Sequence, residues 1–126
     1  MTQLVLIRGI PGSGKSTMAR LKYPNHILVE ADMYFTDFYG NYNYDPSKIR
    51  DAHEWCQKAT KAYLKKGYNV VVANTFIKKW ETQPYIKMAK TFGIPMKIEV
   101  AKGNYESIHN VPKDVIERMK ENFENE

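Results

Sequence analysis

The chain has 126 residues, a formal net charge of +5 and one cysteine. This length suits one compact domain, expected over residues 1–126, and no apolar run approaches the ~20 residues that span a bilayer. A lone cysteine excludes an internal disulfide, and the first residues do not resemble a secretion signal. Because both features are typical of a reducing compartment, we expect a cytoplasmic protein. The positive charge is compatible with nucleic acid or another phosphate-rich partner.

The chain opens with an apolar strand, Leu4–Ile7, which is followed by a phosphate-binding pattern. The run Gly9-Ile10-Pro11-Gly12-Ser13-Gly14-Lys15-Ser16 matches G-x-x-x-x-G-K-[ST] at each fixed position, and a helix is predicted from about Lys15. Its glycines let backbone amides approach phosphate oxygens, Lys15 is predicted to reach the β- and γ-phosphates, and Ser16 to bind Mg²⁺. The predicted ATP-binding residues are Gly12, Ser13, Gly14, Lys15, Ser16 and Thr17.

The second strand, His26–Val29, leads into an acidic position, Asp32. Because ligands bind beyond the carboxyl ends of parallel strands, Asp32 is expected in the same crevice as Lys15. A carboxylate there accepts the proton of an attacking hydroxyl group or orients that group. Lys15 and Asp32 are therefore the predicted catalytic residues, with an aspartate that only caps a turn as the alternative to Asp32.

The segment from Met33 to Tyr44 is rich in aromatic residues, and we expect it to form a loop. Its rings suit stacking on the bases of a single strand, and its position after Asp32 favours the substrate side of the crevice. Packing over the end of the sheet is the alternative. Tyr34 is the aromatic residue that we predict to bind substrate.

The next helix has Asp45 as its N-cap, Pro46 at its first position and Gly67 past its end. Its apolar positions should face the sheet. They are Ile49, Ala52, His53, Cys56, Ala59 and Tyr63.

The third strand, Val70–Ala73, is apolar on both faces and is predicted to be central in the sheet. Asn74 and Thr75 follow it, and we predict that both bind substrate in the crevice. Many P-loop proteins have a metal-linked acidic residue on such a strand, but this strand ends without one.

The last third of the chain has a helix from about Trp80 to Phe92, then Met96–Val100, which alternates like an edge strand. A final helix is predicted from Pro112. His109 lies just before it, and a substrate-binding role there is weighed equally against a structural one. No grouping of His, Cys or carboxylate residues has zinc-ligand spacing, so no zinc is expected.

These motifs together resemble the polynucleotide-kinase-like P-loop kinases, and among them the ATP-binding domain of NEDD4-binding protein 2 and its short relatives. The resemblance covers nearly the whole chain. Besides the phosphate-binding run, it rests on Asp32-x-Tyr34-Phe35, Asp45-Pro46, Ala52-His53-x-Trp55-Cys56, Trp80-Glu81-x-x-Pro84-Tyr85, His109-Asn110-Val111-Pro112 and Ile116-Glu117-Arg118-Met119.

The resemblance implies an α/β, P-loop kinase-type three-layer fold with a four-stranded, mostly parallel sheet flanked by helices. In that fold the third strand lies beside the first. The resemblance also implies ATP and Mg²⁺ as cofactors at Lys15 and Ser16, and Asp32 as the general base for a 5′-hydroxyl. The region before Val111 would close as a lid.

The chain departs from this family at positions that matter for catalysis. Met33 stands where members commonly have a second acidic residue, and Phe35 stands where the phage enzyme of the group has an arginine. Ala73 and Asn74 replace the usual acidic end of the third strand. The lid, residues 103–108, lacks an arginine, and arginine stabilisation of the transferring phosphoryl group is worth ~10³–10⁵ in rate.

Three hypotheses follow for the function. The first is an ATP- and Mg²⁺-dependent kinase that phosphorylates the 5′-hydroxyl of DNA or RNA. The second is a kinase for a nucleoside, a modified base or another small hydroxyl substrate. The third is a nucleotide-binding module with little turnover, which the missing acidic residue and lid arginine favour. The expected partners are a nucleotide and a nucleic acid, without a membrane.

Overall fold

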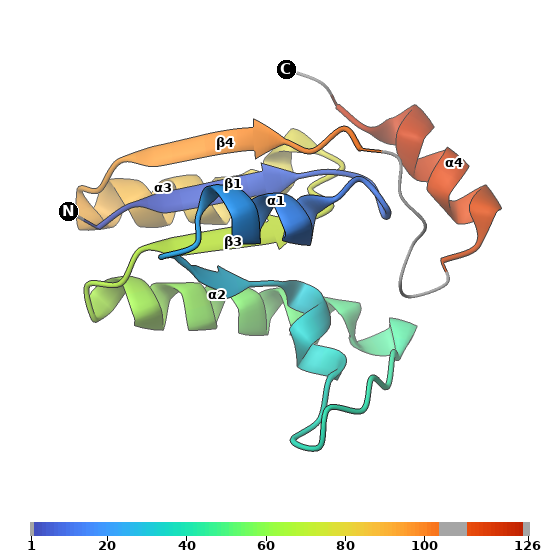
Figure 1. Ribbon diagram of the computed structural model, residues 1–126, viewed down its shortest axis with the longest axis horizontal. Coiled ribbons are helices and arrows are strands. Elements are labelled where there is room, and N and C mark those ends of the chain that lie inside the picture. The colour runs from blue at the N-terminus through green and yellow to red at the C-terminus, as the bar shows by residue number, and fades with distance from the viewer. Residues whose placement is uncertain (1, 104–110, 125–126) are drawn as a thin grey trace.

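The computed structural model describes residues 2–103 and 111–124. Within these ranges one four-stranded sheet has the order β2-β3-β1-β4, and its neighbouring strands are all parallel, as the arrows in Figure 1 show. The third strand therefore lies beside the first, as predicted, and the fourth lies at an edge. The strands are β1 (Leu4–Arg8), β2 (Ile27–Val29), β3 (Val70–Asn74) and β4 (Met96–Val100).

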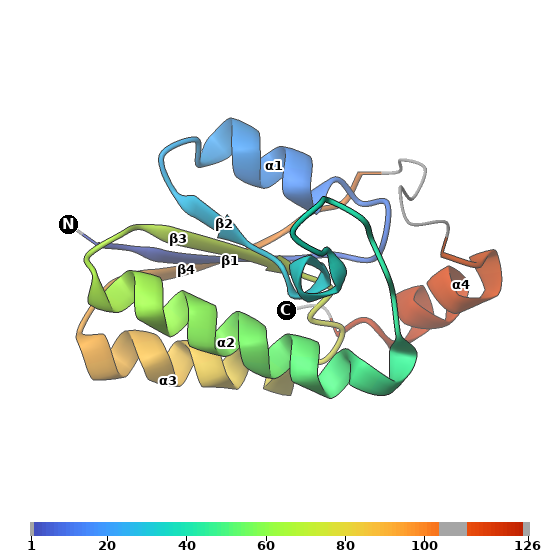
Figure 2. The same ribbon diagram turned by 90° about the horizontal axis from the view of Figure 1, so that it is seen from below.

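The helices cover both faces of this sheet (Figure 2). Helix α1 (Lys15–Lys22) lies on one face, and α2 (Ile49–Lys65) and α3 (Gln83–Phe92) lie on the other. Helix α4 (Lys113–Asn122) lies beyond the carboxyl ends of the strands. The three-layer α/β arrangement predicted from the sequence is confirmed. Across residues 2–103 and 111–124, each helix is too short or too polar to cross a membrane.

The central strand β1 is buried on both faces, as apolar runs in parallel sheets commonly are. Leu4 and Leu6 pack on the side of α2 and α3, whereas Val5 and Ile7 pack on the side of α1. Each of these four side chains is completely buried, and each such burial contributes about 1.5–3 kcal/mol. This packing fixes β1 rigidly, and the phosphate-binding run begins directly after it.

The beginning of the second long helix differs from the prediction. Asp45 is the N-cap as expected, and its carboxylate accepts a hydrogen bond from the Ser47 backbone N–H at 3.0 Å. The following turn, η2 (Pro46–Lys48), is a 3₁₀ helix, and α2 begins only at Ile49. Ile49, in the first turn of α2, is 41% exposed, and the buried residues of the helix are Ala52, Cys56, Thr60 and Leu64.

Two further 3₁₀ helices occur at connections. The start of the predicted aromatic loop is η1 (Ala31–Phe35), which corrects the expectation of a loop from Met33 onward. The turn η3 (Lys79–Thr82) precedes α3. Short 3₁₀ turns are common as connectors, and the one at η1 brings Phe35 into the core, where it is 7% exposed.

Candidate active site

The loop between β1 and α1 has the conformation that its glycines permit. Gly12 and Gly14 have φ angles of 82° and 86°, which side chains with a Cβ disfavour. At Gly9 an added Cβ would overlap Ser13 Oγ and lie 3.1 Å from the Ala101 carbonyl oxygen. The loop is therefore folded closely on itself and on the segment after β4. It ends at the N-terminus of α1, the kind of end that binds phosphate.

Backbone hydrogen bonds tie this phosphate loop to its neighbours. The Gly9 N–H donates to the carbonyl of Thr75, just past β3, at 3.2 Å. The Gly103 N–H donates to the Ser13 carbonyl at 2.9 Å. The loop is thus fixed between the end of β3 and the segment that follows β4.

Lys15 lies partly buried over the phosphate loop, and its Nζ donates to the Ile10 carbonyl at 3.1 Å. Burial lowers the pKa of Lys15 from 10.5 to about 8, while the nearby carboxylates of Glu30 and Asp32 act in the opposite direction. The structure therefore brings Lys15 and Asp32 within electrostatic reach of each other.

The lowered pKa of Lys15 predicts that nucleotide affinity depends on pH. Above about pH 8 the free protein loses this positive charge, whereas bound phosphates favour the charged form. The affinity for ATP should therefore fall as the pH rises above about 8, by at most about tenfold per pH unit. Calorimetric titration on both sides of this pH measures the effect. Lys15→Arg, which stays charged, should show a flat profile, and a flat wild-type profile would contradict the prediction.

Glu30 lies beside the predicted metal ligand, although no role was predicted for it from the sequence. The Ser16 hydroxyl donates a hydrogen bond to Glu30 Oε2. Hydroxyl and carboxylate oxygens are ligands that Mg²⁺ prefers, so these residues fit the metal. Among the described residues no group of three or more His, Cys, Asp or Glu side chains could hold a metal ion. An ion here would complete its shell with phosphate oxygens and water. The sequence signal was only the position of Glu30 directly after a strand.

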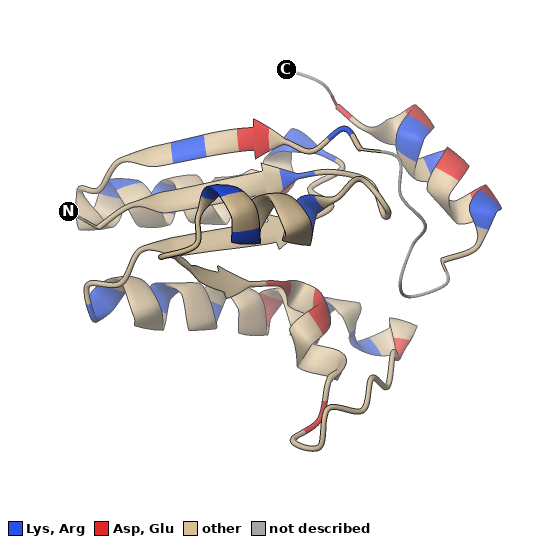
Figure 3. Ribbon diagram, viewed as in Figure 1, with Lys and Arg blue, Asp and Glu red and all other residues tan. Residues whose placement is uncertain are grey.

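Asp32 lies in η1, two residues beyond Glu30, with an exposed side chain. The Tyr42 hydroxyl donates to Asp32 Oδ1 at 3.1 Å. Burial, together with the Asp32 charge and this bond, raises the pKa of Tyr42 to about 12, so Tyr42 remains a donor at neutral pH. In Figure 3 acidic positions mark the passage from β2 into η1, and basic positions mark α1. The Asp32 carboxylate is thus exposed to solvent and held by Tyr42.

The aromatic segment has a packed part and an exposed part. The Phe35 ring contacts Tyr42 and Tyr44 edge to face, with centroids 6.4 Å and 5.2 Å away. The tip of the following loop exposes Phe38 by 98% and Tyr39 by 85%. Packing, one of the two alternatives from the sequence, describes the part around Phe35, and base stacking by the exposed rings stays a prediction.

The predicted substrate residues fall in different places. Tyr34 is 39% exposed and its ring lies 6.4 Å from that of Trp55. Thr75 contacts the phosphate loop through its carbonyl, as described above. His109 lies outside the described residues, as does the predicted lid apart from its first residue.

Asn74, for which a substrate contact is predicted from the sequence, makes hydrogen bonds within the fold. It is buried, its Oδ1 accepts from the Ala31 N–H at 2.8 Å, and its Nδ2 donates to Cys56 Sγ at 3.5 Å. Buried polar groups are stable only when they are bonded in this way. Asn74 therefore holds the junction between β2 and η1, on which the two acidic side chains lie.

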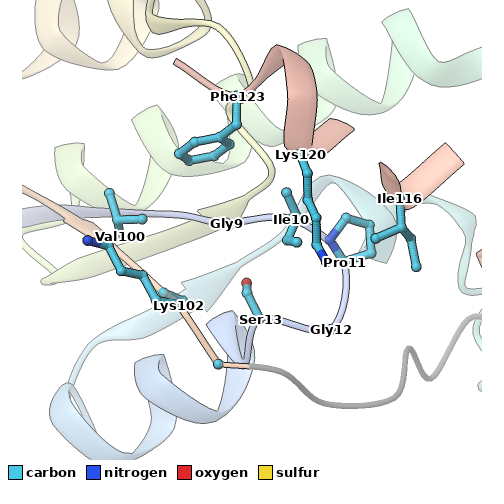
Figure 4. A pocket seen from close by; sticks show the side chains of 12 residues that line it. Gly9, Ile10, Pro11, Gly12, Ser13, Val100, Lys102, Ile116, Lys120 and Phe123 are labelled. Atoms are coloured by element: carbon cyan, nitrogen blue, oxygen red, sulfur yellow. The ribbon is translucent and has the colours of Figure 1, made fainter. Parts of the chain in front are cut away.

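A pocket of about 410 Å³ lies between the phosphate loop and α4 (Figure 4). Ser13 lines this pocket. Its Oγ is buried and has no hydrogen-bond partner in the described part of the chain. Apolar side chains line the pocket together with the loop backbone, Lys102 and Lys120, a mixture that suits the base and sugar of a nucleotide bound through its phosphates. Its apolar lining comes from Ile10, Pro11, Val100, Ile116 and Phe123.

The pocket and Asp32 flank the phosphate loop on opposite sides. The pocket adjoins the segment after β4, whereas Asp32 follows β2, and these strands form the two edges of the sheet. A ligand in the pocket and a second ligand beside Asp32 would therefore approach the loop from different directions.

Helix α4 is held over the pocket through Arg8, the last residue of β1. Arg8 is only 1% exposed. Its Nε donates to the Phe76 carbonyl at 3.0 Å and its Nη2 donates to the Glu124 carbonyl at 2.6 Å. The guanidinium carbon lies 4.6 Å from the centroid of the Phe123 ring. One buried side chain thus joins the end of β1 to the segment after α4.

Comparison with known proteins supports this reading of the fold. A family model described as an AAA domain matches residues 4–102. The human (Homo sapiens) NEDD4-binding protein 2 is 34% identical over an alignment of 137 positions, which takes in 96% of this chain and 8% of the relative. The chain therefore spans only a small part of that relative's length.

Solved structures share the fold at lower identity. The Pnkp1/Rnl/Hen1 RNA repair complex has a matching chain with a TM-score of 0.70 and 19% identity, covering 97% of this chain and 44% of that one. The APS kinase CysC of Mycobacterium tuberculosis has a TM-score of 0.56 and 14% identity, covering 95% and 93%. The chain belongs to the AAA domain family whose model covers residues 4–102, and its fold is that of the P-loop kinases.

Proposed function

We propose that this protein is an ATP-dependent kinase that transfers the γ-phosphate to the 5′-hydroxyl of DNA or RNA. The observation that carries the proposal is the arrangement around the phosphate loop. A pocket suited to a nucleoside lies on the β4 side, and the Asp32 carboxylate lies on the β2 side. A phosphate donor and an acceptor bound at these places would meet beside Lys15.

The residues of the chain account for the steps of transfer. The loop amides and the start of α1 bind the phosphates, and the Lys15 charge stabilises the charge on the transferring phosphoryl group. Asp32 accepts the proton of the acceptor hydroxyl as the new P–O bond forms, and ADP leaves with the electrons of the broken P–O bond. Tyr42 holds the Asp32 carboxylate in place. Magnesium, when bound, neutralises charge on the phosphate oxygens.

Three observations support a nucleic acid as the acceptor. The loop that holds Asp32 through Tyr42 also exposes the rings of Phe38 and Tyr39. Stacking of a base on such a ring is worth about 1–3 kcal/mol. The net charge of +5 attracts a polyanion, and a structure with the same fold belongs to an RNA repair complex.

A nucleotide-binding module with little turnover is the second candidate. The observation that favours it is the end of β3, where Asn74 stands in place of an acidic residue and is engaged within the fold. A kinase for a nucleoside or another small hydroxyl compound would use the same donor side and differ only at the acceptor.

Transfer of labelled γ-phosphate from ATP to a set of acceptors tests the proposal. The set contains DNA and RNA oligonucleotides with a 5′-hydroxyl, the same oligonucleotides with a 5′-phosphate as matched controls, nucleosides, and water alone. Only the 5′-hydroxyl oligonucleotides should be labelled, and Lys15→Ala should reduce labelling by about 10²-fold or more. Labelling of nucleosides alone would favour the small-acceptor kinase. ATP binding without any labelled acceptor would favour the binding module.

A further inference from the structure

The end of β3 supplies no carboxylate to the phosphate loop. P-loop proteins commonly hold Mg²⁺ through an acidic residue on such a strand together with the loop Ser or Thr. Here the strand ends in Asn74, whose amide is bonded to the Ala31 N–H and to Cys56 Sγ. An ion at Ser16 would therefore lack its usual protein carboxylate unless another strand provides one.

Glu30 reaches this place from the neighbouring strand. Strand β2 pairs in parallel with β3, and Val29 lies opposite Val72, so Glu30 lies one residue beyond that pair, level with Ala73, the residue before the last of β3. Its carboxylate accepts a hydrogen bond from the Ser16 hydroxyl, and its charge acts on Lys15.

We infer that Glu30 is the protein carboxylate of the magnesium site and replaces, from β2, the acidic residue missing from β3. Because this role presupposes a bound nucleotide, it rests on the proposed function, but it concerns the donor side alone. The two acidic side chains of the junction then have separate tasks. Glu30 faces Ser16 and the metal, whereas Asp32 is exposed, bonded to Tyr42, and faces the acceptor.

The charge of Glu30 should have opposite effects on the binding of nucleotide with and without metal. Without metal, the carboxylate and the nucleotide phosphates repel each other, and with metal the same carboxylate attracts the cation between them. Glu30 should therefore weaken the binding of metal-free ADP and strengthen the binding of Mg–ADP. The ratio of the two affinities isolates this effect from any general change in the pocket.

The experiment measures ADP affinity by calorimetry with Mg²⁺ and with a chelator, for the wild type, Glu30→Gln and Asp32→Asn. Glutamine keeps an oxygen that accepts from Ser16 but removes the charge. Asp32→Asn is the matched control, since it removes an equal charge from the same junction. Thermal melting establishes that each variant is folded.

Glu30→Gln should lower the ratio of Mg–ADP to metal-free ADP affinity by about 10–100-fold, and Asp32→Asn should change it by less than about threefold. The affinity of Mn²⁺ for the protein–ADP complex, measured by electron paramagnetic resonance, should also fall in Glu30→Gln. An unchanged ratio in Glu30→Gln, or an equal loss in Asp32→Asn, would overturn the assignment. Because the readout is binding, the result is independent of whether any oligonucleotide is phosphorylated.

Discussion

Replacing Asp32 with asparagine should slow phosphoryl transfer by about 10²–10⁴-fold, the range for loss of a general base, while nucleotide affinity stays close to that of the wild type. Asparagine has nearly the same shape, and its amide oxygen can still accept from the Tyr42 hydroxyl, which donates to Asp32 at 3.1 Å. It cannot take a proton from the acceptor. Single-turnover transfer from labelled ATP to a 5′-hydroxyl oligonucleotide measures the rate, and calorimetry measures the affinity for Mg–ADP.

Tyr42→Phe is the matched variant for this prediction, because it keeps the carboxylate and removes only the bond that holds it. Its transfer rate should fall less than that of Asp32→Asn. An Asp32→Asn variant that transfers phosphate at a rate near that of the wild type would exclude Asp32 as the general base. A variant that loses Mg–ADP affinity to the same degree as transfer would place Asp32 on the donor side, with Glu30.

Much of the fold could be predicted because the relevant signals are local. The β3 residues Val70–Ala73 are apolar on both faces, which indicates a central strand, and the structure has it beside β1. Glycines at the phosphate loop have the positive φ angles that their pattern requires. The cap residue Asp45 was also predicted correctly, but it caps the 3₁₀ turn η2, and the start of α2 only at Ile49 was not predicted.

Contacts between distant segments account for what the sequence did not reveal. Glu30 reaches Ser16 only because β2 pairs with β3 in one register. The sequence likewise does not reveal that the buried amide of Asn74 is bonded to η1 and α2. Arg8 ends an apolar strand, and in sequence nothing distinguishes it from a solvent-exposed arginine, since its acceptors lie far along the chain.

Replacing this Arg8 with methionine should destabilise the folded protein strongly. The Phe76 and Glu124 carbonyls accept from its guanidinium. Leaving the buried Phe76 carbonyl without a partner costs about 1–3 kcal/mol, and loss of the partly buried bond to Glu124 adds about 1.5 kcal/mol. The expected loss of about 3 kcal/mol is a large part of the 5–15 kcal/mol typical of a folded domain. Denaturant unfolding measures it. Arg20→Met on α1, an exposed arginine, is the matched control and should change stability by less than about 0.5 kcal/mol.

The same substitution should also weaken nucleotide binding, because Arg8 connects β1 to the wall of the nucleoside pocket. Phe123, which lies under the guanidinium, and Ile116 of α4 both line that pocket. If α4 separates from β1, the pocket loses these apolar surfaces while the phosphate loop keeps its own. Arg8→Met at a temperature where it remains folded should therefore bind ADP more weakly but bind pyrophosphate, which lacks a nucleoside, as the wild type does. Equal weakening of both ligands would mean that Arg8 acts through the phosphate loop instead.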